Sequence, residues 1–314
     1  RDGSSAFSYT GNQWQNFYSV GLGWLMSEEA WMKDITWLDM LKLKGSWGTL
    51  GNQNLDKAYP AEPLLTNAYS AVFGKPSAIY PGYQLAYLPN PKLRWEKVEA
   101  WEAGAEANFL RNRLHFEGVY YKKKTKDLLI WNTTPSLEIG GSTSPINAGN
   151  VSNKGLEFEL GWRDHIKDFS YGIRANLATI NNKVTYIDPS ITRLPGSTFH
   201  TYTVTYFEQG YHVYYFRGYK FAGIDPATGN PTFEDIDNSG DVSDNDLTNI
   251  GDAIPDFTYG LTLTAAYKGF DLTIFGTGSQ GNDIFNCINR PDYAASNKQK
   301  ELFYTDRWTT TNTT

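Results

Sequence analysis

Hydrophobic and polar residues alternate one by one along much of this 314-residue chain. The clearest example lies between residues 149 and 163, where Leu156, Phe158, Leu160 and Trp162 occupy every second position. Glycine, glutamate and arginine residues fill the positions between them. Because successive side chains of a β-strand point to opposite faces, this stretch is predicted to form a strand with one apolar and one polar face.

Seven other segments alternate in the same way, so about eight strands are predicted. These segments are residues 18–26, 41–50, 95–109, 114–124, 169–177, 257–265 and 272–276. The connections between them are alternately short and long. Tight turns are predicted at residues 110–113, 164–167 and 268–270, and long loops at about 51–93, 131–150, 183–255 and 279–314. Because alternation is lost within 183–255, no further strand is predicted to cross the sheet there.

The polar second face of every predicted strand indicates a closed barrel with lipid outside and water inside. Short periplasmic turns and long extracellular loops are typical of such barrels. The mean hydropathy of -0.49 fits this interpretation, because a barrel strand shows lipid only every second residue. The predicted fold is therefore all-β, a transmembrane antiparallel β-barrel. Eight strands are enough to close alone, but the abrupt ends of the chain favour a part of a larger barrel.

The charge balance and cysteine content exclude some other classes. The net charge of -6 argues against general nucleic-acid binding, which needs a basic surface. The single cysteine, Cys287, excludes an internal disulfide. The four histidines show no metal-ligand spacing along the chain, at His115, His165, His200 and His212.

Acidic residues between positions 235 and 246 follow the spacing of an EF-hand-type calcium loop. Gly240, at the sixth position, allows the sharp turn that wraps the chain around an ion. The predicted Ca²⁺ ligands are Asp235, Asp237, Ser239, the carbonyl of Asp241, and Asp246. Serine at the fifth position and aspartate at the twelfth depart from the usual pattern. The alternative is an acidic turn that holds no ion.

Carboxylates also recur on the polar faces of the predicted strands. Same-face neighbours on a strand lie about 6–7 Å apart, which is within the range of paired glycosidase carboxylates. However, water-facing charges on several strands are also what a barrel lumen contains, and no nucleophile–base pattern appears, so no enzymatic activity is predicted. The candidate lumen or substrate-contacting residues are Glu102, Glu106, Glu157, Glu159, Arg163, Arg174 and Asn176.

Several motifs, in order along nearly the whole chain, together resemble the SusC/RagA family of TonB-dependent outer-membrane transporters of Bacteroidetes. They are RDGSS, FYSVGLGWLMSEEAW, LKLKGSWGTLGNQNL, WEKVEAWEAGAEANFLRNRLHFEGVYYKKKTKDLL, NAGNVSNKGLEFEL and the stretch from GYKFAGID to GNDIFN.

The resemblance implies a multi-pass, 22-stranded outer-membrane barrel, of which this chain supplies a part without the plug. It implies import of glycans or oligopeptides, powered by TonB-ExbB-ExbD acting through that plug. It also implies a SusD-like lipoprotein lid, an assembly of two barrel–lid pairs, and a structural Ca²⁺ in an extracellular loop.

Three other functional classes are compatible with a β-rich chain. A passive porin would lack the plug, and a barrel enzyme would need a fixed catalytic cluster. A soluble sugar-binding or adhesive domain would bury its apolar faces in a sandwich. The cargo is left open between glycan and peptide.

Overall fold

The computed structural model describes residues 1–55, 59–131, 145–189, 191–286, 301, 305 and 307–312. These form two compact units. The first comprises Arg1–Leu194, Phe207–Val213 and Pro255–Gly281, and the second comprises Pro195–Tyr206, Tyr214–Ile254 and Asn282–Thr314. Cys287 lies outside the described residues.

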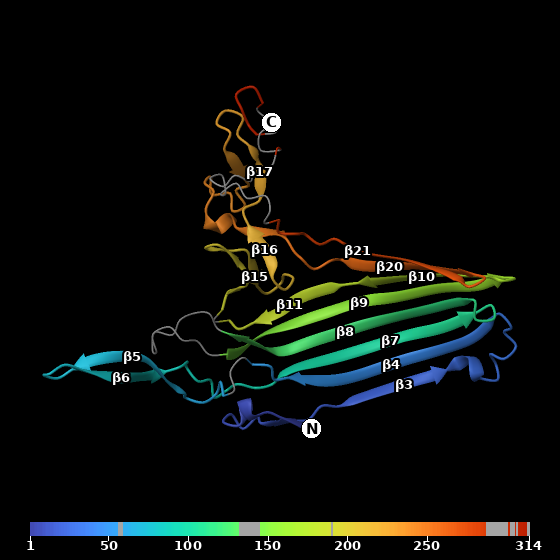
Figure 1. Cartoon of the computed structure of the whole chain (residues 1–314), viewed down its shortest axis with the longest axis horizontal. Helices are drawn as coiled ribbons and strands as arrows, with labels where there is room; N and C mark the ends of the chain where they lie inside the picture. The colour runs from blue at the N-terminus through green and yellow to red at the C-terminus, as the bar shows by residue number, and fades with distance from the viewer. Residues whose placement is uncertain are drawn as a thin grey trace. The chain divides into compact units, whose positions relative to one another are not determined.

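An antiparallel sheet of nine strands dominates the first unit (Figure 1). Its strands are β3 (Ser19–Leu25), β4 (Leu38–Asn52), β7 (Glu96–Phe109), β8 (Leu114–Trp131), β9 (Pro145–Ile166), β10 (Phe169–Thr179), β11 (Asn181–Ile187), β20 (Phe257–Tyr267) and β21 (Phe270–Gln280). Eight of them pair in the order β21-β20-β10-β9-β8-β7-β4-β3, and β11 pairs with β9 beyond the end of β10. Every predicted strand is therefore present, and each lies beside its neighbours in sequence.

The tight turns lie at one end of these strands. Leu110, Arg111 and Asn112 all have positive φ between β7 and β8, and Lys268 and Gly269 have positive φ between β20 and β21. Positive φ at both central residues lets a two-residue hairpin follow the twist of its strands. The turn predicted at 164–167 is displaced, because β9 continues to Ile166 and only residues 167 and 168 turn.

Strands β8 and β9 extend beyond the alternating stretches that predicted them. Residues 145–150, predicted as loop, form the start of β9 and pair with both β8 and β11. Register shifts near Leu128 absorb the irregular sequence, with Asp127 in the left-handed region. Pairing with two partners thus extends the strand where alternation is absent. The rest of the predicted 131–150 loop, residues 132–144, lies outside the described residues.

The predicted loop at 51–93 contains regular structure. Strands β5 (Leu65–Phe73) and β6 (Ala78–Leu85) form an antiparallel hairpin within it. Close to the chain start are β1 (Asp2–Gly3), the 3-10 helix η1 (Ser5–Phe7) and β2 (Trp14–Gln15), and a second 3-10 helix, η2 (Met26–Glu28), follows β3. Phe7, Leu93 and Trp95 form a small buried core here. The 51–93 connection therefore contains a hairpin that alternation did not predict, since hairpin pairing needs no strict alternation.

Short strands replace the predicted 183–255 loop. They are β12 (Leu194–Pro195), β13 (Thr198–Phe199), β14 (Tyr202–Thr203), β15 (Thr205–Phe207), β16 (Tyr215–Gly218), β17 (Phe221–Ile224), β18 (Pro231–Phe233) and β19 (Thr248–Gly251), with the 3-10 helix η3 (Asp244–Asp246). Apart from β11, no described strand in this range joins the large sheet. The prediction that no further strand crosses the sheet here is confirmed. Of the predicted 279–314 loop, residues 287–300 and several after them lie outside the described residues.

The large sheet has an apolar and a polar face. On the apolar face, Leu22, Leu160 and Ile274 are 79%, 51% and 54% exposed. A soluble sheet covers such a face with other elements. Uncovered leucine and isoleucine side chains on several strands suit contact with lipid and disfavour a soluble sandwich. Among the described residues, no helix is long and apolar enough to span a membrane.

Candidate functional site

The seven candidate lumen residues lie on the polar face of the nine-stranded sheet. Residues directly opposite each other on neighbouring strands share a face. Glu106 of β7 lies opposite Glu117 of β8, and Glu117 lies opposite Glu159 of β9. Asn176 of β10 lies opposite Glu159 and completes the row. The two-residue period of each strand places the others on this face, namely Glu102, Glu157, Arg163 and Arg174.

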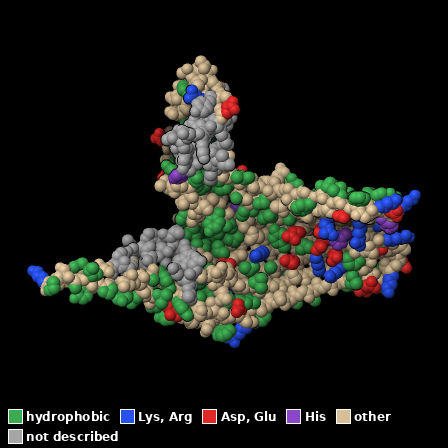
Figure 2. Space-filling view, in the orientation of Figure 1, with side chains coloured by type: hydrophobic (Ala, Val, Ile, Leu, Met, Phe, Trp, Pro, Cys, Tyr) green, Lys and Arg blue, Asp and Glu red, His purple; other side chains and the backbone are tan. Residues whose placement is uncertain are grey.

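Glu159 forms the centre of a charged cluster on this face. Its Oε1 lies 3.3 Å from Arg174 Nε and 4.0 Å from His115 Nε2. The other ring nitrogen of His115, Nδ1, is 2.7 Å from Asn108 Oδ1. The cluster draws one residue from each of four neighbouring strands, namely Asn108 from β7, His115 from β8, Glu159 from β9 and Arg174 from β10. Figure 2 shows acidic, basic and histidine side chains gathered over the sheet.

Three further residues belong to the polar face but were not predicted as site residues: Lys44, His115 and Glu117. Lys44 forms an ion pair with Glu117. Alternation alone could have assigned Lys44 and Glu117 to the polar face, because Lys44 follows Leu43 and Glu117 follows Phe116. Their pairing required the register of β4, β7 and β8, which the sequence did not supply.

The seven candidates form an extended wall rather than one compact site. Arg163 lies near the tight turns, where its Nε donates to the carbonyl of Asn112 at 3.1 Å. Glu102 contacts a different strand, accepting from Ser46 Oγ at 3.5 Å. Charges of both signs spread over several strands are typical of a water-filled lumen.

The acidic loop, residues 235–246, lies in the second unit and ends in η3. Asp235 accepts hydrogen bonds from two backbone amides, those of Ser239 at 3.1 Å and Gly240 at 2.7 Å. Asp237 accepts from the Ser239 amide at 3.0 Å. Gly240 has a φ of +95°, a conformation that favours glycine. The loop therefore turns its backbone amides toward its own carboxylates.

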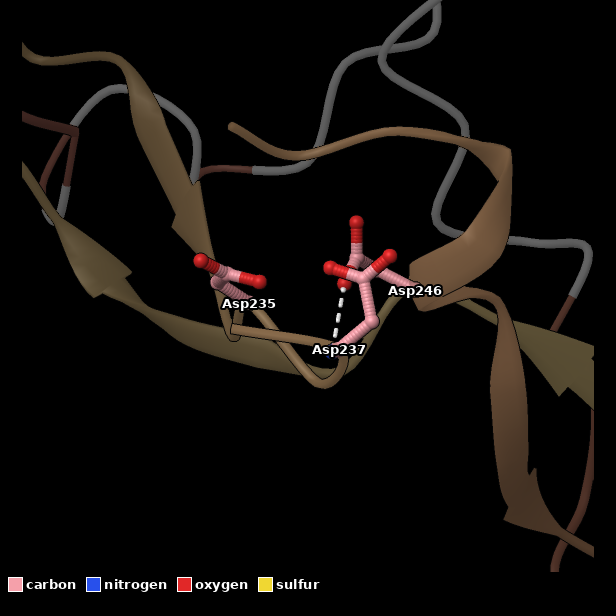
Figure 3. A group of neighbouring side chains, drawn as sticks. All are labelled: Asp235, Asp237 and Asp246. Carbon is pink, nitrogen blue, oxygen red and sulfur yellow. Dashed lines mark hydrogen bonds between the residues drawn. The ribbon is translucent and has the colours of Figure 1, made fainter. Parts of the chain in front are cut away.

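Asp246 is the most enclosed residue of the loop, with no exposed surface. Its Oδ1 accepts from the amide of Ile236 at 2.7 Å, and its Oδ2 accepts from the Ser243 amide at 2.7 Å. Oδ1 also accepts from the amide of Asp237 at 3.2 Å, the hydrogen bond drawn in Figure 3. The Ser243 amide, followed by the amides of Asp237 and Ile236, lowers the pKa of Asp246 below its usual value, although burial opposes this. The carboxylate is therefore ionised at neutral pH.

The donor set of the acidic loop fits a hard divalent cation. Asp235, Asp237 and Asp246 each offer an oxygen, and these oxygens lie within 4.8 Å of one another. No lysine or arginine of the described chain pairs with these three carboxylates. Ser239 Oγ donates to the Asp241 carbonyl at 3.0 Å, so these two predicted ligands contact each other. Ca²⁺ takes six to eight oxygen ligands, and three converging carboxylates can supply part of such a set.

Comparisons with known proteins agree with this architecture. The family described as "TonB dependent receptor-like, beta-barrel" matches residues 1–314. A TonB-dependent receptor of Formosa agariphila is 31% identical over all of this chain, and the TonB-dependent receptor SusC of Bacteroides thetaiotaomicron is 29% identical over 90% of it. The solved "RagAB peptide transporter" aligns over 89% of this chain with a TM-score of 0.76 and 26% identity.

The chain covers 33% of the Formosa receptor, 29% of SusC and 30% of the RagAB transporter chain, so it spans about a third of their length. The matching family is one of receptors rather than enzymes, which confirms the prediction against catalysis. The resemblance to SusC and RagA that the motifs indicated is also confirmed. The chain therefore belongs to the TonB-dependent receptor-like β-barrel family, and SusC and the RagAB transporter are among the proteins it resembles.

Proposed function

We propose that this protein imports oligomeric nutrients, either glycans or oligopeptides, across the outer membrane by a TonB-dependent mechanism. The observation that carries the proposal is the sheet with an exposed apolar face and a continuous polar face. Such a sheet, continued by further strands, encloses a polar passage within lipid. Cargo passes along this wall with its covalent bonds intact.

The polar face offers both donors and acceptors to a passing oligomer. Arg174 and Lys44 provide cationic donors, and Glu102 and Glu157 provide acceptors. Glycans and peptides both present alternating donors and acceptors, so the wall suits either class. Exposed charges bind such cargo weakly, which favours movement over retention.

The proposed assembly includes three partners outside this chain. A SusD-like lipoprotein closes the barrel from outside, a plug blocks the passage, and TonB-ExbB-ExbD supplies energy through the plug. The similarity to SusC and to the RagAB transporter supports this arrangement, as does the family match over the whole chain. We further propose that two barrel–lid pairs associate, and that the barrel crosses the membrane many times.

Uptake by whole cells tests this function. Cells that carry the complete protein should accumulate labelled oligosaccharide or oligopeptide, and a protonophore should abolish that accumulation. The double variant Glu159→Gln/Arg174→Gln should lower the uptake rate, whereas Lys167→Gln, in a tight turn, should not. Uptake that survives the protonophore would indicate a passive pore and contradict the proposal. Copurification of a lipoprotein with the detergent-extracted protein tests the proposed lid.

We propose that the acidic loop holds one structural Ca²⁺, with Asp235, Asp237 and Asp246 as its carboxylate ligands. The ion would neutralise three converging negative charges and fix the loop, away from any cargo chemistry. Serine at position 239 and the Asp241 carbonyl are the remaining proposed ligands.

Calcium binding is tested by calorimetry on the complete protein after chelator treatment. Asp237→Asn should weaken binding strongly. Asp244→Asn is the matched control, because Asp244 lies in the same loop but accepts from Tyr219 at 3.0 Å. Equal binding by both variants would show that Asp237 is not a ligand, and no binding by the unaltered protein would show that the loop is an acidic turn without an ion.

A further inference from the structure

Six lysines gather on the apolar face of the large sheet, toward the end of the strands where the long connections begin. On β8, Lys122 follows Tyr120 by two positions, and on β9, Lys154 precedes Leu156 by two. Each therefore projects from the same face as its apolar neighbour. The six, here called the lysine groove, are Lys97, Lys122, Lys124, Lys126, Lys154 and Lys183.

The register sets like charges directly against each other in the lysine groove. Lys122 lies opposite Lys154 across β8 and β9, and Lys97 lies opposite Lys126 across β7 and β8. Like charges in directly opposed positions destabilise a sheet. An anion from outside the chain would relieve this repulsion.

The chain itself supplies little counter-charge. Lys126 Nζ lies 2.9 Å from Glu99 Oε2. Within the described residues, none of the other five lysines forms an ion pair. The groove therefore carries a net positive charge on the same face as the exposed apolar side chains.

The groove also contains neutral hydrogen-bond donors. A hollow of about 410 Å³ is lined by five of the lysines together with Ser152 and Asn181. Lys124, Lys126, Lys154 and Lys183 are exposed at its rim. Ammonium groups beside hydroxyl and amide groups are the donor set that binds phosphate oxygens.

The position of the groove identifies the source of the phosphate. Trp101 lies opposite Lys122 on the same face, and Trp47 lies opposite Trp101. Tryptophan and tyrosine residues lie at the level of lipid headgroups. The lysines beyond them lie on the side of the long connections, which is the extracellular side in outer-membrane barrels. A phosphate held there belongs to the outer leaflet.

We propose that the lysine groove binds the phosphate groups of a phosphorylated glycolipid of the outer leaflet, lipid A being the probe. The lipid's acyl chains lie along the apolar band next to Leu156 and Tyr120, and its headgroup phosphate lies between Lys122 and Lys154. The groove thereby fixes an ordered lipid at β8, β9 and β11. This lipid site is separate from the proposed import path, because it lies on the opposite face of the sheet.

Reconstitution tests this site. The complete protein and the variant Lys122→Gln/Lys124→Gln/Lys154→Gln/Lys183→Gln are placed in nanodiscs that contain lipid A. Native mass spectrometry then counts the lipid A molecules retained per protein. The variant should retain about tenfold less, because each basic residue near an anionic surface contributes measurably to attachment. Dephosphorylated lipid A should be retained equally poorly by both proteins.

The control variant carries the same charge change elsewhere, as Lys75→Gln/Lys92→Gln/Lys167→Gln/Lys268→Gln, and should retain lipid A normally. The double variant Lys122→Gln/Lys154→Gln provides the same comparison if the fourfold variant does not fold. Equal loss in groove and control variants would overturn the proposal. Equal retention of phosphorylated and dephosphorylated lipid A would also overturn it. Displacement of lipid A by millimolar inorganic phosphate would overturn the lipid as the source.

Discussion

The large sheet and the acidic loop are held by different kinds of hydrogen bond. The sheet depends on backbone pairs that repeat along nine strands, so almost any side chain of the right polarity serves at a given position. The loop depends on a few carboxylates that accept backbone amides, with Asp235 and Asp246 accepting most of them. The sheet should therefore tolerate many substitutions that leave its backbone in place, whereas the loop should fail at single residues.

The strongest test of this contrast is Asp246→Ala. The change removes the acceptor of three partly buried backbone hydrogen bonds and one proposed Ca²⁺ ligand. We expect Ca²⁺ affinity to fall more than about 100-fold, since even outer-shell partners of metal ligands contribute 10–100-fold. Calorimetry measures the affinity, and limited proteolysis between residues 235 and 246 reports the loop. Unchanged affinity and cleavage would show that the loop does not depend on this residue.

Two glycines of β9 test the sheet. A Cβ on Gly155 would collide with the carbonyl of Thr179, whereas the nearest atom to a Cβ on Gly161 is His115 Cβ at 3.6 Å. Gly155→Ala should therefore destabilise the barrel by about 1–3 kcal/mol, the range for overpacking. Gly161→Ala should be neutral. Urea unfolding of the complete protein in detergent compares them, and equal midpoints would show that the β9–β10 contact relaxes freely.

Gly240→Ala makes the matching test in the loop. Nothing lies within 4 Å of a Cβ at Gly240, so space does not oppose alanine there. The backbone φ of +95° at Gly240 does oppose alanine, and it makes the substitution unfavourable by about 1–2 kcal/mol. We expect weaker Ca²⁺ binding with an unchanged unfolding midpoint of the sheet. A fall in both properties would mean that loop and sheet unfold together.

Acid should open the loop before it affects the sheet. Because the folded pKa of Asp246 is lowered, its ionised form stabilises the loop above the unfolded pKa of about 3.9. This stability is lost as pH falls through the folded value, below about pH 4. Tryptophan fluorescence and loop proteolysis between pH 6 and pH 2 would detect the step. Asp246→Asn should abolish it, and a step that persists in this variant would belong to another group.

The smallest effect is expected for the charges on the polar face. Arg174 is 67% exposed and Glu159 is 34% exposed. Exposed ion pairs contribute less than about 1 kcal/mol, so Glu159→Gln should change the unfolding midpoint very little. The same variant should still alter cargo uptake if this face lines the passage. A large loss of stability would show that the pair holds the sheet together instead.

Most of the large sheet was predictable because alternation is a local property of the chain. The face on which each of Leu156, Glu157, Phe158 and Glu159 lies follows from alternation alone, so the strand partners need not be known. The start of β9 was missed because residues 145–150 are strand only through pairing with β8 and β11. The β5–β6 hairpin was missed for the same reason.

The candidate sites were likewise predictable only in part. The acidic loop was predictable from spacing, since its proposed ligands lie within twelve consecutive residues. The burial of Asp246 was not predictable, because it results from the fold of the whole loop around that side chain. On the polar face, the sequence indicated which residues point inward but not that Glu159 would meet Arg174 and His115.

The sequence by itself determined the strands, the two faces, the short turns and the acidic spacing. Each of these depends on residues close together in the chain, where side-chain direction follows directly from backbone geometry. Only the tertiary structure decided which strands extend, which charges meet on the polar face, and that Lys122 and Lys154 oppose each other on the apolar face. Those outcomes depend on strand register, because a slip of one residue moves every side chain to the other face.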